Sequence, residues 1–99
     1  MIKNDRSRSH AYNIILAYES SGRQLKSVRN DYFNTNNLSS SERSRSMALS
    51  NEVVRWKRTL DNWIARSLKK PIKKLPLKVL CILRLGYYEY VLSLIHISE

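Results

Sequence analysis

The chain has 99 residues, 42% of them hydrophobic, which suits one small globular domain and excludes a disordered tail. Two glycines and two prolines are too few for turn-rich sandwiches or barrels, or for a glycine-lined phosphate loop. Eighteen lysines and arginines against eight acidic residues give a net charge of +10, which indicates an anionic partner, nucleic acid before a membrane surface.

Two helices are predicted in the first third of the chain. The first covers residues 7–19, because apolar side chains recur there at helical spacing. These are Ala11, Ile14, Ile15 and Tyr18. The Ser-Ser-Gly sequence that follows is typical of a helix end. A shorter helix is predicted over residues 25–33, and the asparagine-rich residues 34–37 are expected to form a loop.

A long helix is predicted over residues 40–69. Ser39 and Glu42 form the S-x-x-E pattern of a capping box, in which each side chain accepts a hydrogen bond from the other's backbone N–H. No glycine or proline interrupts the segment before Pro71. Its apolar residues step by four and three, which predicts one buried seam that includes both tryptophans. The seam residues are Leu49, Val53, Trp56, Leu60 and Trp63.

A last helix is predicted over residues 77–92, after a basic connector at residues 71–76. Cys81 lies between apolar neighbours and is expected to be a small buried side chain. Gly86 weakens a helix interior and is therefore expected to mark a close helix approach. Arg84 stands in an apolar stretch, so we expect it either to pair with Glu89 or Asp61 or to be exposed.

The positive charge is concentrated in the middle of the chain. Residues 39–84 carry a net charge of +9, against +3 for residues 1–38 and −2 for residues 85–99. Basic side chains neutralise phosphates and release counterions, so these residues are candidates for RNA contact. The candidates are Lys3, Arg6, Arg8, Arg55, Arg58, Lys69, Lys70, Lys73 and Lys74.

Each group of candidates also has a structural interpretation. The first three form an N-terminal arm, with Arg23, Lys26 and Arg29 on the next element, and a solvated, frayed terminus is the other interpretation of the arm. Arg55 and Arg58 share one face of a continuous helix, where Arg58 could instead brace Asp61. Lys69 and Lys70 are suited to a helix C-terminus. Lys73 and Lys74 belong to a dense run that also includes Arg66 and Lys78, and they could simply be solvated.

Several segments together resemble a known family. They are R-S-H-A-Y-N-I-I-L at 8–16, S-E-R-S-R-S-M-A-L at 41–49, V-V-R-W-K-R-T-L-D at 53–61 and L-R-L-G-Y-Y-E-Y-V-L at 83–92. In this order they resemble the NusB-like RNA-binding domain. The R-W-x-R-x-L-D form is most similar to the domain that precedes the catalytic domain of bacterial 16S rRNA cytosine-C5 methyltransferases of the Sun/RsmB type. One departure is Glu52, where the family usually has glycine.

The resemblance implies an all-α fold of two packed three-helix units, with RNA contacted from the basic N-terminal arm. It implies a module that holds rRNA while a separate C-terminal methyltransferase domain transfers methyl from S-adenosylmethionine. An alternative is a free-standing NusB-type antitermination factor that binds boxA RNA with a ribosomal protein. An alternative of another class is a basic amphipathic protein that coats anionic membranes.

The resemblance also predicts an incomplete bundle, because family members continue into further helices. The expected domain is residues 1–92, with residues 93–99 a non-native or disordered tail. The ending L-S-L-I-H-I-S-E resembles the translation of an adaptor used in sequencing libraries. Without the remaining helices, Tyr87, Tyr90 and Val91 are expected to be partly exposed.

Residues suited to catalysis are not recognisable in this chain. His10 has no ligand companion at metal-site spacing, and the single Cys81 excludes a disulfide framework and a multi-cysteine zinc site. Cytosine methylation needs a nucleophilic cysteine and a cofactor-binding sheet. We therefore predict a non-enzymatic fragment without metal or cofactor of its own. It has no leader and no apolar run of about 20 residues, which predicts a cytoplasmic protein rather than a membrane protein.

Overall fold

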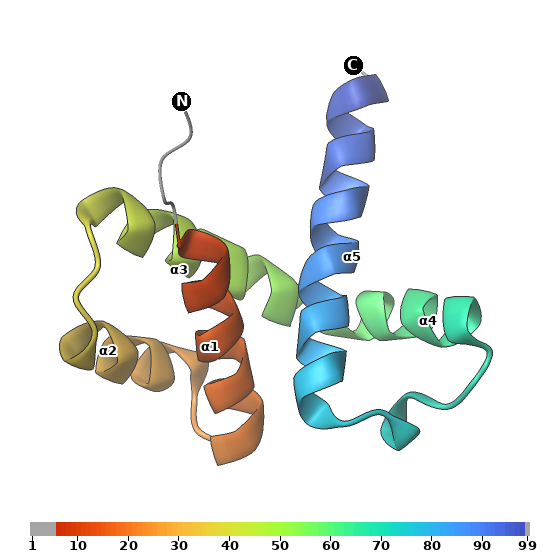
Figure 1. Ribbon diagram of the computed structural model, residues 1–99, viewed down its shortest axis with the longest axis horizontal. Helices are drawn as coiled ribbons and strands as arrows, with labels where there is room; N and C mark the ends of the chain where they lie inside the picture. The colour runs from red at the N-terminus through yellow and green to blue at the C-terminus, as the bar shows by residue number, and fades with distance from the viewer. Residues whose placement is uncertain (1–5, 99) are drawn as a thin grey trace. The chain divides into compact units, whose positions relative to one another are not determined.

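The computed structural model describes residues 6–98, and every regular element in that range is helical (Figure 1). The elements are α1 (Ser7–Ser21), α2 (Leu25–Thr35), α3 (Ser40–Arg55), α4 (Lys57–Leu68), the 3-10 turn η1 (Ile72–Lys74) and α5 (Leu77–Ser98). The predicted all-α class is confirmed. The chain divides into two compact units, Met1–Val54 and Arg55–Glu99, which are described separately.

Unit 1 contains α1, α2 and α3 around a small apolar core. Its fully buried side chains on α1 are those that the helical spacing predicts, Ala11, Ile14 and Ile15. Val28 of α2 and Val53 of α3 are buried as well. Helix α1 ends at Gly22, whose φ of 74° is left-handed and whose N–H donates to the Tyr18 carbonyl.

The predicted capping box at the start of α3 is confirmed. The Ser39 N–H donates to Glu42 Oε1 and the Glu42 N–H donates to Ser39 Oγ, both at 3.2 Å. One turn further on, Ser46 and Ser50 are fully buried. The Ser50 hydroxyl donates to the Ser46 carbonyl at 2.8 Å, so the helix itself satisfies a polar group that the core would otherwise leave unpaired.

The prediction of one long helix over residues 40–69 was wrong. Helix α3 ends at Arg55, α4 begins at Lys57, and Trp56 between them has φ −95° and ψ 13°. The interruption coincides with the boundary between the units, because Val53 belongs to the core of unit 1 whereas Leu60 and Ile64 are buried in α4. A stripe that serves two cores does not need one continuous helix.

The prediction that both tryptophans lie in one buried seam was also wrong. Trp56 and Trp63 are 46% and 37% exposed, so neither is the core residue that the seam predicts. Once the helix is interrupted at residue 56, the four-three stepping no longer places all five seam residues on one face. Ile64, next to Trp63, takes the buried position on α4.

Unit 2 consists of α4, the turn η1 and α5, and α4 packs against both of its neighbours. The expectation for Cys81 is confirmed, since it is fully buried. Gly86 does not mark a close approach, because it is exposed and an added Cβ would meet nothing within 4 Å. Helix α5 continues past the predicted end at Leu92 as far as Ser98.

The end of α5 has the exposure expected for its aromatic and apolar residues. Tyr90 is 64% exposed, and Tyr87 and Val91 are half-buried. The domain limits of 1–92 and 93–99 and the incompleteness of the bundle stay predictions.

Candidate nucleic-acid interface

The start of α1 lies beside the first turn of α3. Arg6 and Arg8 are exposed there, whereas Lys3 lies outside the described residues. The backbone N–H of Arg6 donates to Glu42 Oε2 at 3.2 Å. Because the N–H groups of Ser39 and Arg6 both donate to this carboxylate, the pKa of Glu42 lies below its ordinary value. The charged carboxylate thus links Arg6, at the start of α1, to the first turn of α3.

This contact adds two arginines that the sequence reasoning did not select. Arg43 and Arg45 follow Glu42 within one helical turn, and both are exposed. We call Arg6, Arg8, Arg43 and Arg45 the arginine cluster. The sequence S-E-R-S-R-S indicates a helix start, but it carries no signal that the distant α1 terminus binds there. Only the long-range bond between Arg6 and Glu42 reveals the cluster.

A row of rings crosses unit 1 next to the arginine cluster. The Arg43 Cζ lies over the Phe33 ring, 5.4 Å from its centroid, and Phe33 meets Tyr32 edge-on at 6.3 Å. Tyr32 in turn meets His10 of α1 edge-on at 5.6 Å. The Tyr32 hydroxyl is 2.6 Å from His10 Nδ1 and accepts from Asn13 Nδ2 at 3.1 Å. These contacts connect all three helices of the unit.

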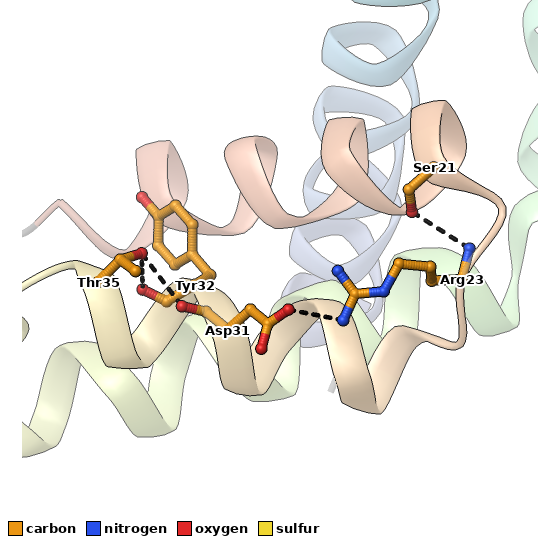
Figure 2. A network of polar contacts seen from close by, with 5 residues as sticks. All are labelled: Ser21, Arg23, Asp31, Tyr32 and Thr35. Carbon is orange, nitrogen blue, oxygen red and sulfur yellow. Dashed lines mark hydrogen bonds and ion pairs between the residues drawn. The ribbon is translucent and has the colours of Figure 1, made fainter.

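Two other basic residues of unit 1 have structural partners. Figure 2 shows Arg23, in the α1–α2 loop, reaching Asp31 on α2, with its Nη2 2.6 Å from Oδ2. The Arg23 N–H also donates to Ser21 Oγ. Arg29 donates from Nη1 to Asn51 Oδ1 at 2.7 Å and so links α2 to α3. Both arginines therefore link elements within unit 1.

The prediction that Arg55 and Arg58 share one face of a continuous helix was wrong. Arg55 is the last residue of α3 and Arg58 lies in α4, so the interruption at Trp56 comes between them. Both are exposed, and the Arg55 guanidinium lies over the Trp56 ring at 5.6 Å. Their contact with RNA stays a prediction.

Asp61 pairs with Arg84 of α5, one of the two partners predicted for that arginine. Arg84 donates from Nε to Oδ1 at 2.7 Å and from Nη2 to Oδ2 at 2.9 Å. The Arg84 side chain is 5% exposed and that of Asp61 22%. This two-pronged pair joins α4 to α5, and it joins the R-W-x-R-x-L-D segment to the L-R-L-G segment. The two sequence motifs therefore meet in the structure.

The predicted basic residues between α4 and α5 form one exposed stretch. We call Lys69, Lys70, Lys73 and Lys74 the lysine connector. All four are exposed, Lys73 and Lys74 lie in η1, and the flanking Arg66 and Lys78 are exposed too. Lys69 ends α4 in the left-handed conformation, with φ 56°, and its N–H donates to the Ala65 carbonyl. The sequence between residues 66 and 78 contains no acidic residue, so no carboxylate within this stretch offsets its positive charge.

Two further kinds of site are absent from the part of the chain that the structure describes. Within residues 6–98, no helix has the length and apolar character needed to cross a bilayer. The same residues contain no cluster of three or more His, Cys, Asp or Glu side chains placed to hold a metal.

One comparison with known proteins gives a match. The sequence model of the NusB family matches residues 5–95. No curated protein and no solved structure matches the chain. The matched range covers nearly the whole chain and includes both units.

Proposed function

The chain belongs to the NusB family, whose domains bind RNA, and on that premise we propose that it binds RNA through the arginine cluster and the lysine connector. The observation that carries the proposal is the arginine cluster. The bond from Arg6 to Glu42 brings basic residues from two distant segments to one end of unit 1. Exposed arginines on neighbouring segments suit phosphate binding, because each guanidinium can donate two parallel hydrogen bonds.

The lysine connector supports the same proposal with different chemistry. Lysine is a compact point charge on a flexible stem, so a run of exposed lysines attracts a phosphate backbone without reading its sequence. The connector therefore adds affinity, and the arginine cluster adds positioning. Arg55 and Arg58 belong to the proposal as exposed cations that flank the helix interruption.

More specifically, we propose that the chain is the N-terminal RNA-binding module of a 16S rRNA cytosine-C5 methyltransferase. The R-W-x-R-x-L-D form of residues 55–61 supports this assignment. S-adenosylmethionine and the methyl-transfer chemistry would then belong to a C-terminal domain in cis. The alternative is a free-standing antitermination factor that binds boxA RNA. Sequencing the source gene past the codon for Val91 separates the two, because only the first continues into a catalytic domain.

RNA binding is tested by measuring affinity for an rRNA fragment across a salt series. For single strands, each phosphate contact contributes about 0.7 to the slope of log affinity against log salt. Replacing Arg6 and Arg8 by alanine should therefore reduce the magnitude of the slope by about 1.4. Replacing the four connector lysines should reduce it by up to about 2.8. Lys26→Ala, which removes an exposed charge of α2 outside both surfaces, is the matched control.

Two results would contradict the proposal. One is a salt slope that none of these substitutions changes relative to Lys26→Ala. The other is binding to anionic vesicles, but not to RNA, which would identify a membrane surface as the anionic partner. Neutral vesicles provide the baseline for that comparison.

A further inference from the structure

We infer that Arg43, whose guanidinium lies over the Phe33 ring, is a platform for an unpaired RNA base, so that unit 1 selects single-stranded over duplex RNA. The inference rests on the proposed RNA binding and specifies which form of RNA this surface takes. It assigns Arg43 a role beyond phosphate binding, and it assigns Phe33 a role beyond packing.

The first support is the way in which the ring is held. Phe33 is half-buried near the end of α2, and Tyr32 meets it edge-on. Tyr32 is itself fixed to α1 by its hydroxyl contacts with His10 and Asn13. Figure 2 shows the Tyr32 side chain extending from α2 toward α1. The contacts of Tyr32 with α1 therefore restrict the movement of the Phe33 ring.

The second support is the placement of the guanidinium. The Arg43 Cζ lies over the Phe33 ring, 5.4 Å from its centroid, while the residue as a whole is exposed. A guanidinium restrained by an aromatic ring loses less freedom when a base stacks on it from solvent. Ring, guanidinium and base would then form a three-layer stack.

The third support is the surrounding charge. Arg43 belongs to the arginine cluster, whose other members can bind the phosphates on either side of a stacked base. Aromatic and arginine planes are the usual platforms for unpaired bases, because every base has a π-face. In a duplex that face is covered by neighbouring base pairs. The combination of a supported platform and nearby phosphate donors thus favours single strands.

The test uses the full chain and a single-stranded RNA oligonucleotide with one 2-aminopurine, a base whose fluorescence falls when it stacks. The wild-type chain should quench this fluorescence in at least one position of the oligonucleotide. Arg43→Lys keeps the charge but removes the planar group, and we expect it to lose the quenching and to weaken binding about fivefold or more. Arg23→Lys, at an exposed arginine outside the arginine cluster, is the matched control and should leave both readouts unchanged.

A duplex of the same sequence and a second variant complete the design. Arg43→Lys should change duplex affinity by less than about twofold, because charge is conserved. Phe33→Leu keeps an apolar side chain but has no π-face, so it should reproduce the loss of quenching. Circular dichroism of this variant checks that its helix content is unchanged. If Arg43→Lys binds and quenches like the wild type, the stacking inference is wrong while RNA binding stands. If the wild-type chain binds neither RNA, the proposed function fails as well.

Discussion

Two helices of this chain end in the same backbone conformation with different residues. In unit 1, α1 ends at Gly22 with φ 74°, and in unit 2, α4 ends at Lys69 with φ 56°. A residue with a Cβ pays about 1 kcal/mol or more to adopt the left-handed conformation, whereas glycine adopts it freely. Unit 2 thus carries a cation where glycine would be more stable. The comparison suggests that the charge of the connector matters more there than the stability of the helix end.

The ion pairs of the two units also differ, and here unit 2 has the less exposed pair. The pair of Arg23 and Asp31 in unit 1 has side chains 50% and 62% exposed, so water screens it. The pair of Arg84 and Asp61 in unit 2 is nearly enclosed. In unit 1 the exposed pair joins α2 to the α1–α2 loop, whereas in unit 2 the enclosed pair joins two helices, α4 and α5.

The largest expected effect comes from breaking the enclosed pair. Asp61→Asn removes the negative charge that Arg84 binds through Nε and Nη2 in a nearly enclosed place, which should lower the free energy of unfolding by about 3 kcal/mol. The matched change in unit 1, Asp31→Asn, should cost less than about 1 kcal/mol. Denaturation of the full chain measures the loss of unfolding free energy in both variants. Hydrogen exchange then shows whether α4 and α5, or α1 and α2, have lost protection.

A double variant completes this comparison. Replacing Asp61 by Leu together with Arg84 by Met removes both charges, and it should recover most of the stability lost in Asp61→Asn. Equal losses for Asp61→Asn and Asp31→Asn would show that the enclosed pair is no stronger than the exposed one.

The helix ends give effects of about 1 kcal/mol with opposite signs. Gly22→Ala places a Cβ in the left-handed conformation and should destabilise unit 1 by about that amount. Lys69→Gly relieves the same strain and should stabilise unit 2 by a similar amount. Thermal melting measures both. If Lys69→Gly also lowers the salt slope of RNA binding, the lysine is retained for its charge; a stabilised variant with an unchanged slope would contradict that interpretation.

Gly86 offers a gain of comparable or smaller size inside α5. It is exposed, and a Cβ there would meet nothing within 4 Å, so Gly86→Ala should stabilise the helix by up to about 1 kcal/mol. Gly22→Ala is the opposite control, because only that glycine has a positive φ. Melting that falls in Gly86→Ala would mean that this surface of α5 approaches another segment or molecule in solution.

Local patterns predicted what local physics determines. The capping box of Ser39 and Glu42 and the α1 stripe depend on residues within a few positions of one another, and both are confirmed. The interruption at Trp56 carries no glycine or proline, because its cause is the change of core between Val53 and Leu60. Sequence reasoning that follows one helix at a time cannot detect such a change.

The site shows the same limit at longer range. Arg84 and Asp61 could be proposed as partners because an arginine in an apolar stretch needs a carboxylate. Arg43 and Arg45 could not be chosen, because their place beside Arg6 depends on one hydrogen bond across 36 residues. The charge of the site was thus evident from the sequence, but its assembly from two segments was not.

The smallest expected effect is the pH dependence that Glu42 gives to unit 1. The N–H groups of Ser39 and Arg6 hold the pKa of Glu42 below its ordinary value of 4.5, so the ionised carboxylate is favoured in the folded state. Its stabilisation is complete above the ordinary pKa and is lost as the pH falls through the lower, folded value. Unit 1 should therefore weaken as the pH drops below about 5, and Glu42→Gln should flatten that part of the profile. Denaturation across this range, followed by hydrogen exchange of α1 and α3, measures the difference. If the stability of Glu42→Gln changed with pH in parallel with the wild type, this carboxylate would not be what holds Arg6. The arginine cluster would then lack the contact that assembles it.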